Sequence, residues 1–360
     1  MHTEKPTLTG LLVLPRLRVQ NANAISSPLT WGFPSITAFI GFMHALERRL
    51  RDSTGLEFWK VGVVCHHFEA QATKGGFTRS FHLTRNPVGK DGSPAAIVEE
   101  GRVHLEVTLV FQVAMHADQQ SEAQRQLLAD QVAAEVAGMR VAGGSVMPPV
   151  LPAAASSNAA TGTGLTARRR LRPYLELLNS DGEQGRKAFR RLSRRWLPGF
   201  ALVSRDDLLQ ERVAALKESD SKATVLDAWL SLSRLTHRAS KVQKLNDKTG
   251  EPSEVVEWTA ERPKGWIVPI PVGYSALSTL HVAGEVANAR DSVTPFIFVE
   301  SVYSMGQWIS PHRLTDVNEM LWLSEHDEAN GLYRCINDFR PPARIAIAPI
   351  ASAAAAANIH

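Results

Sequence analysis

Apolar residues recur at two different spacings over the first 147 residues, and this change of period limits the folds that the chain can adopt. Residues 104–113 alternate, with Leu105, Val107 and Leu109 on one face, which is typical of a half-buried strand. Steps of three and four, as from Phe39 to Met43, predict an amphipathic helix instead. The two patterns predict, in order, a strand at 11–19, a helix at 35–51, strands at 59–68 and 104–113, a helix at 122–137 and a strand at 139–147.

The predicted order, βαββαβ, is that of a ferredoxin-like fold in the α+β class. In this arrangement two helices cover one face of a four-stranded antiparallel sheet, and the other face is left for ligands or partners. The connection over residues 69–102 is longer than an ordinary loop. We expect it to form an inserted hairpin within a first domain of residues 1–147.

The remaining residues predict a linker, a second domain and a tail. Residues 148–167 are rich in Ala, Ser, Gly and Pro, which is typical of a flexible linker, and residues 341–360 form an Ala-rich tail that we do not expect in the core. Between them, residues 168–340 predict a basic part of mixed helices and strands. We expect helices at 186–196, 206–217, 224–235 and 313–323, strands at 266–280 and 295–303, and a polar, mobile segment at 240–254.

The cysteine content excludes several classes of protein. Only Cys65 and Cys335 are present, which rules out a disulfide framework and a four-cysteine zinc site and fits a reducing cytoplasm. No stretch is long and apolar enough to predict a membrane span, and no signal peptide is evident. The sequence predicts neither a metal site nor a cofactor.

A polar loop over residues 20–35 lies between the first strand and the first helix. It contains Asn21, Asn23, Ser26 and Ser27 close to a helix N-terminus, where hydrogen-bond donors favour phosphate or sugar contact. The same side chains could equally satisfy the turn itself. Trp31 could stack on a base or anchor the core.

Arg140, Gly143 and Gly144 form a smaller signal of the same kind. Paired glycines let the backbone approach a phosphate closely, although a bulge in an edge strand would explain them equally well.

Residues 168–195 carry the strongest charge signal. Ten basic and three acidic residues give this segment a net charge of +7, compared with +4 for the whole chain. A solvated helical face is one interpretation, but nucleic-acid or partner binding is favoured. The basic residues are Arg168, Arg169, Arg170, Arg172, Arg186, Lys187, Arg190, Arg191, Arg194 and Arg195.

No catalytic constellation is evident. His66, His82 and His104 lie on or near predicted strands and could supply a general acid and base for RNA cleavage. Histidines that serve the fold are the favoured interpretation, and the sequence contains no Walker A, G-x-S-x-G or H-E-x-x-H motif.

Several long segments resemble one family of CRISPR-associated proteins, the Cas-five-type subunits of type I-F systems, which belong to the RAMP superfamily. The similarity covers most of the chain except the linker and the tail. It is carried by residues 12–17, 20–34, 68–71, 83–87, 95–109, 139–145, 196–205, 265–278, 285–291 and 310–313.

The resemblance implies a ferredoxin-like core with an inserted thumb, in a cytoplasmic, non-catalytic subunit of the Csy surveillance complex, a Cascade that serves antiviral defence. Such a subunit holds the five-prime handle of the crRNA. It pairs with the large Cas-eight-type subunit beside the Cas-seven-type backbone subunits, and it contacts target DNA through the complex. An endoribonuclease that processes crRNA with the strand histidines, or a structural adaptor without RNA contact, are the alternatives.

The candidate RNA contacts combine the polar loop with positions inside the matching segments. They are Asn21, Asn23, Ser26, Ser27, Trp31, Arg85, Asn86, Arg102, Arg140, Gly143 and Gly144, followed by Arg290, His312 and Arg313.

Overall fold

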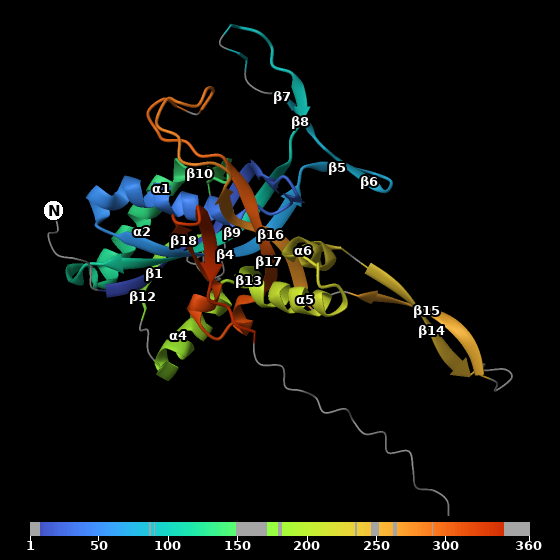
Figure 1. Cartoon of the computed structure of the whole chain (residues 1–360). Coiled ribbons are helices and arrows are strands. Elements are labelled where there is room, and N and C mark those ends of the chain that lie inside the picture. Colours follow the sequence, from blue (N-terminus) through green and yellow to red (C-terminus); the bar gives the residue numbers. More distant parts are fainter. Residues whose placement is uncertain are drawn as a thin grey trace, which may run out of the picture.

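Figure 1 shows the fold of the chain, a computed structural model. Several sequence-predicted features lie outside the residues that it describes: Asn86, Arg290, Arg168 to Arg170, residues 246–251 of the polar segment, and nearly all of the linker and the tail. For Arg85 only the backbone is described. The described residues are 8–85, 88–89, 91–148, 171–178, 182–234, 236–245, 252–261, 265–289 and 291–341.

The first half contains the predicted strands and helices. They are β1 (Leu8–Asn23), α1 (Ile36–Thr54), β4 (Glu57–Ala70), β9 (Arg102–Met115) and α2 (Glu122–Ala137). The predicted last strand is wrong in one respect: it is a hairpin of β10 (Arg140–Val141) and β11 (Gly144–Met147). Its two turn residues, Ala142 and Gly143, have φ values of 48° and 78°, as a tight type I′ hairpin turn requires. The strands lie in the order β11, β1, β9, β4, and neighbours are antiparallel.

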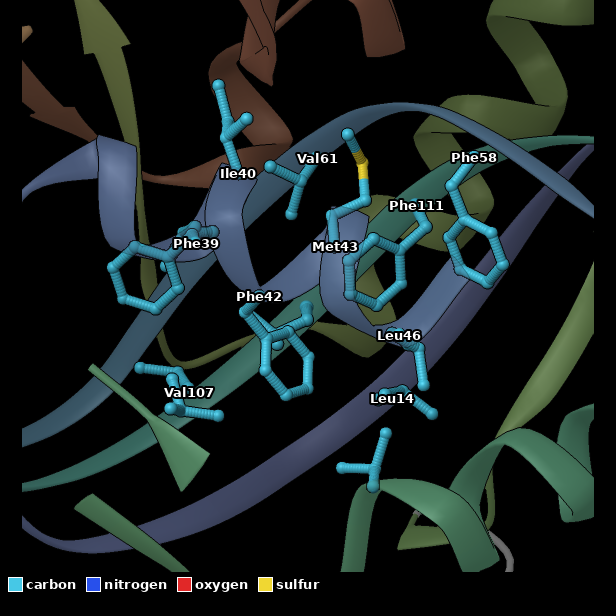
Figure 2. Close-up of a cluster of buried hydrophobic side chains, with 14 of the residues drawn as sticks. Leu14, Phe39, Ile40, Phe42, Met43, Leu46, Phe58, Val61, Val107 and Phe111 are labelled. Atoms are coloured by element: carbon cyan, nitrogen blue, oxygen red, sulfur yellow. The ribbon is translucent and has the colours of Figure 1, made fainter. Parts of the chain in front are cut away.

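Helices α1 and α2 cover one face of this part of the sheet. Ser35 caps α1 by accepting a hydrogen bond from the N–H of Thr37, and Gly55 ends the helix in the left-handed conformation. The buried side of α1 packs on β4 and β9, where Met43 lies near Phe111 and the ring of Phe58 meets that of Phe111 edge-on at 5.5 Å (Figure 2). Leu12 and Leu14 of β1 complete this core.

The inserted segment contains two hairpins rather than one. They are β5 (Ala72–Gly75) with β6 (Thr78–Phe81), and β7 (Leu83–Arg85) with β8 (Ile97–Glu99). Main-chain hydrogen bonds join their bases, from Gln71 N–H to Arg102 and from His82 N–H to Gln71. A third small hairpin, β2 (Ile25–Ser27) with β3 (Thr30–Trp31), follows β1.

The second half extends the same antiparallel sheet. Beyond β4 come strands that the sequence did not all predict, and β18 pairs back onto β4, so the pairings close a circuit. The strands of the circuit after β4 are β13 (Phe200–Ser204), β17 (Val299–Ile309), β16 (Trp266–Ala276), β19 (Leu332–Asn337) and β18 (Leu321–Asp327). A short strand, β12 (Tyr174–Leu177), pairs with β1.

Three predicted helices are present as α4 (Gly182–Arg195), α5 (Asp206–Ser219) and α6 (Val225–Ser233). The helix predicted at 313–323 is wrong. Two short 3-10 turns, η2 (Pro311–Arg313) and η3 (Val317–Met320), lead there into β18, because Pro311 and a cap at Asp316 interrupt the backbone. The described residues of the polar segment at 240–254 lie in a hairpin of β14 (Thr236–Leu245) and β15 (Pro252–Glu261).

The sequence predicted that the sheet face opposite α1 would be left open. That prediction is wrong, because a second cluster of side chains covers this face. Leu11 and Val13 of β1 pack there against Phe189, Leu192 and Trp196 of α4 and its end, together with side chains from η3. Alternate residues of β1 therefore serve two cores, one on each face of the sheet.

Candidate nucleic-acid interface

A polar cavity of about 410 Å³ lies where the end of β1, the base of the insertion and the β10–β11 hairpin meet. It brings together four of the sequence-predicted residues, which come from three separate segments of the chain: Asn21, Arg102, Arg140 and Gly143. The other lining residues are Gln20, Gln71, His82, Thr84, Glu100 and Ser145. The predicted loop, the insertion and the first of the paired glycines thus converge on one site.

Asn21 lies at an irregularity in β1, where the pairing with β9 shifts between Val19 and Ala22. Its φ is 58°, a left-handed conformation that asparagine tolerates better than most residues. The Asn21 N–H donates to His104 Nδ1 at 3.1 Å, while its side chain is exposed. This backbone kink leaves the amide group of Asn21 free to meet a ligand.

The two cavity arginines differ in their partners. Arg102 donates from Nε and Nη2 to Glu100 Oε2 at 2.8 and 2.5 Å, so a phosphate would compete with a carboxylate there. Arg140 is exposed and forms no ion pair with any described residue. Arg140 is therefore the readily available cation of the cavity.

Thr84 was not among the sequence-predicted contacts, although it lies in a segment that carries the family resemblance. It lines the cavity, and its buried hydroxyl oxygen has no hydrogen-bond partner among the described residues. A buried polar group without a partner is costly, which makes Thr84 a further position where a ligand atom would be favourable. Gln71 also lines the cavity and was likewise absent from the sequence-predicted contacts.

The other loop residues mainly satisfy local turns. Asn23 donates to Ile25 O and accepts from Ile25 N–H, and the hydroxyl groups of Ser26 and Ser27 lie 2.8 and 2.6 Å from that of Thr30. Asn23 and Ser26 also line a wider hollow of about 930 Å³ beside α1, which shares Arg140 and Gly143 with the polar cavity. The hollow thus continues from the cavity along the start of α1.

The two glycines have different roles. Gly143 is exposed in the hairpin turn, and a Cβ atom added there would meet nothing within 4 Å. A Cβ atom on Gly144 would lie 2.7 Å from the backbone nitrogen of Ala22. Gly144 therefore permits close packing of β11 on β1 rather than close approach of a phosphate.

An apolar pocket of about 520 Å³ lies on the other side of the β2–β3 hairpin. Trp31 lines it, half exposed, and its ring also meets that of Phe81 edge-on at 5.8 Å. Further aromatic lining comes from the loop before α1 and from both halves of the sheet: Phe33, Phe68, Phe200, Trp266 and Trp308. Trp31 is thus a wall of an aromatic pocket and not a buried core anchor.

His66 also borders this pocket, but both of its ring nitrogens are engaged. Nδ1 lies 2.6 Å from the carbonyl oxygen of Pro198 and Nε2 lies 2.7 Å from Thr108 Oγ1. Burial lowers the pKa of His66, and burial also raises the pKa of the neighbouring Cys65 thiol to about 12. Of the three candidate histidines, only His82 lines the polar cavity, while His104 accepts from Asn21.

The predicted basic segment does not form one continuous face in the described structure. Arg172 pairs with Asp130 of α2 at 2.7 Å, and Arg195 lies over the ring of Tyr174 at 3.8 Å. Arg190, Arg191 and Arg194 are exposed on α4. His312 and Arg313, in η2, lie beside α4 and not in the polar cavity.

The described residues provide neither a metal-binding cluster nor a membrane-spanning helix. They contain no group of three or more His, Cys, Asp or Glu side chains arranged to hold a metal ion. None of the described helices has both the length and the apolarity to cross a membrane.

The sequence of this chain matches the profile of a known family and a curated protein. The profile of the family described as CRISPR-associated protein (Cas_Csy2) matches residues 12–335. A curated protein of Pseudomonas aeruginosa (strain UCBPP-PA14), named CRISPR-associated protein Csy2, is 47% identical over 327 residues, which cover 90% of this chain and 94% of that protein. The resemblance found in the sequence is confirmed.

Proposed function

Because this chain belongs to the CRISPR-associated Csy2 family, we propose that it is the subunit of a type I-F surveillance complex that holds the five-prime handle of the crRNA. The observation that carries the proposal is the polar cavity, in which Asn21, Arg102 and Arg140 converge from distant parts of the sequence. Donors of this kind, arranged around a hollow, suit single-stranded RNA, whose backbone and unstacked bases both need partners.

The proposal includes a ferredoxin-like RAMP core with the insertion as its thumb. The strand order β11, β1, β9, β4, with α1 and α2 on one face, supports this assignment. In this interpretation the cavity lies at the edge where the thumb leaves the core, between Gln71 and Arg102. The fold alone would not indicate RNA binding, which is inferred from the cavity.

The handle would enter by contacts to its backbone. Arg140 is the first candidate for a phosphate, since it is exposed and no described residue pairs with it. Asn21 and Thr84 offer an amide and an unpartnered hydroxyl for sugar or base edges. The wider hollow beside α1 would then accept the following nucleotides, because it shares Arg140 and Gly143 with the cavity.

We further propose that the subunit is not a nuclease. Metal-independent cleavage would need an acid and a base on opposite sides of one phosphate. His82 is the only candidate histidine that lines the cavity, and both ring nitrogens of His66 have partners elsewhere. These contacts argue against the alternative of a crRNA-processing endoribonuclease.

The protein partners follow from the family and not from the described surface. We propose that the chain pairs with the large Cas-eight-type subunit and lies next to the Cas-seven-type backbone, so that it reaches target DNA as part of the complex. A purely structural adaptor would make the same protein contacts without needing the cavity.

The test is binding of labelled crRNA, with and without its five-prime handle, to the chain co-purified with the large subunit. Wild-type protein should retain only handle-containing RNA and leave it uncut. Arg140→Gln should flatten the slope of log affinity against log salt by about 0.7, the value for one single-strand phosphate. Arg48→Gln, which removes an exposed arginine from α1, is the matched control. Equal binding of RNA without the handle would contradict the proposal.

A further inference from the structure

Helix α4 presents an arginine face that the handle site does not use. Its buried side is formed by Phe189, Leu192 and Ser193, and its exposed surface carries Arg186, Arg190, Arg191 and Arg194. All four arginines are exposed, and within the described residues none of them forms an ion pair. The helix is fixed to the sheet through its apolar side, so the arginine face is a rigid surface.

The surroundings of this face add positive charge. η2 packs beside α4 and carries the exposed Arg313. Two acidic residues of this region are engaged, since Glu183 pairs with Lys187 and Glu176 lies 3.7 Å from Arg195. In Figure 1, α4 lies far from the β7–β8 hairpin and from β10, which border the polar cavity. The face is therefore separate from the proposed handle site.

The chemistry of the face favours nucleic acid over protein. A protein interface usually contains buried apolar anchors at its centre. Neither α4 nor η2 exposes a large apolar side chain. A surface that carries exposed arginines and no large apolar side chain suits a phosphate backbone instead, because phosphate contacts supply most of the sequence-independent affinity for nucleic acid.

The geometry favours a duplex over a single strand. Proteins that hold single strands combine cations with exposed aromatic rings for stacking, and neither α4 nor η2 exposes a Phe, Tyr or Trp ring. From Arg186 to Arg194 the helix rises about 12 Å, and duplex DNA carries about seven phosphates over that distance. A straight row of cations matches such a regular array of charges.

We propose that the arginine face of α4 binds the backbone of double-stranded DNA without reading its sequence. This goes beyond holding the crRNA handle, and it uses different residues. It gives the subunit a second nucleic-acid surface, on the face of the sheet opposite α1.

The test uses the purified full-length chain and a short labelled DNA duplex of arbitrary sequence, with affinity measured over a range of salt. The triple variant Arg190→Gln, Arg191→Gln, Arg194→Gln should flatten the log–log salt slope by about 2.7, or about 0.9 for each lost phosphate contact. The control triple variant Arg48→Gln, Arg51→Gln, Lys217→Gln removes the same charge from exposed positions on α1 and α5 and should leave the slope unchanged.

Two further measurements keep the result interpretable. Substituting Lys at the same three positions of α4 should retain most of the slope, since the charge is kept, and thermal unfolding of all variants should match the wild type. Handle-RNA binding should not change in the glutamine variant, so the two proposals can fail separately. An unchanged duplex slope would overturn the inference. The inference would also be overturned if the glutamine variant bound the duplex normally and had lost only its binding of single strands, or only its binding of an acidic protein partner.

Discussion

The main-chain N–H of Asn21 donates to Nδ1 of His104 at 3.1 Å, and this bond joins the kink in β1 to the neighbouring strand β9. The contact uses the backbone of Asn21 and the ring of His104, so it leaves the Asn21 amide side chain exposed. The kink and the ligand-facing group are thus separate properties of one residue. They can be separated by mutation.

Asn21→Gly should keep the fold and weaken RNA binding. Glycine accepts a φ of 58° without strain and retains the N–H that bonds to His104. Asn21→Val should instead lower the free energy of unfolding by about 1–2 kcal/mol, because a β-branched residue is disfavoured in the left-handed region. Urea unfolding together with handle-RNA affinity measures both effects. Equal RNA affinity for Asn21→Gly and the wild type would remove Asn21 from the proposed site.

Gly144→Ala should destabilise the chain by about 1–3 kcal/mol, the usual range for overpacking. The added methyl group would lie 2.7 Å from Ala22 N and 2.8 Å from its Cα atom, and backbone cannot move aside as a flexible side chain can. Gly41→Ala is the matched control. That glycine lies inside α1 with nothing within 4 Å of the added atom, so alanine should stabilise the helix slightly. Thermal unfolding of the two variants should therefore shift in opposite directions.

The strands and helices of the first half could be predicted because their apolar periodicity is local. The observed bounds of α2 coincide with the predicted ones, and β4 and β9 differ by only a few residues at each end. The hairpin of β10 and β11 was missed because a strand with two glycines resembles a bulge until its partner is known. Its turn is defined by two positive φ angles, and these are not visible as a pattern.

Long-range pairing was the harder part of the fold. The first three residues of β18 were predicted as the end of a helix at 313–323, although the buried Leu321 and Trp322 pair with β4, some 260 positions earlier in the chain. For the candidate site, too, the residues could be predicted but their long-range contacts could not. Asn21, Arg102 and Arg140 were all predicted as contacts. Only the fold shows that Arg102 forms an ion pair with Glu100, and that Arg172 of the basic segment forms one with Asp130. Ion pairs between distant residues leave no periodic signal in a sequence.

His66 should make the stability of the chain depend on pH. Burial lowers the pKa of His66 from its ordinary value of 6.5. Just below pH 6.5 the imidazole therefore binds a proton in the unfolded chain but stays neutral in the folded chain. The contribution of His66 to the free energy of unfolding is therefore complete above that value and is lost as the pH falls toward the folded-state pKa. The free energy of unfolding should change there by at most about 1.4 kcal/mol per pH unit. Unfolding in urea at several pH values between neutral and mildly acidic measures this slope.

His66→Gln should reduce that slope, because glutamine does not titrate and can still meet Thr108 or the Pro198 carbonyl. His67→Gln is the control, since the side chain of His67 is 62% exposed. Identical slopes for the wild type and His66→Gln would show that another group controls acid sensitivity.

Glu100→Gln should increase the affinity for handle RNA. In the described structure Glu100 neutralises Arg102 through two hydrogen bonds, and it also places a negative charge in the cavity that the RNA backbone must enter. Replacing the carboxylate by an amide frees the guanidinium for a phosphate, so the log–log salt slope should steepen by about 0.7, one additional single-strand contact. Glu99→Gln makes the same charge change at an exposed neighbouring position that does not line the cavity. Salt-dependent binding of both variants separates a specific release of Arg102 from a general gain in positive charge. Weaker binding by Glu100→Gln would mean instead that the pair orients Arg102, and that the RNA contacts the intact pair.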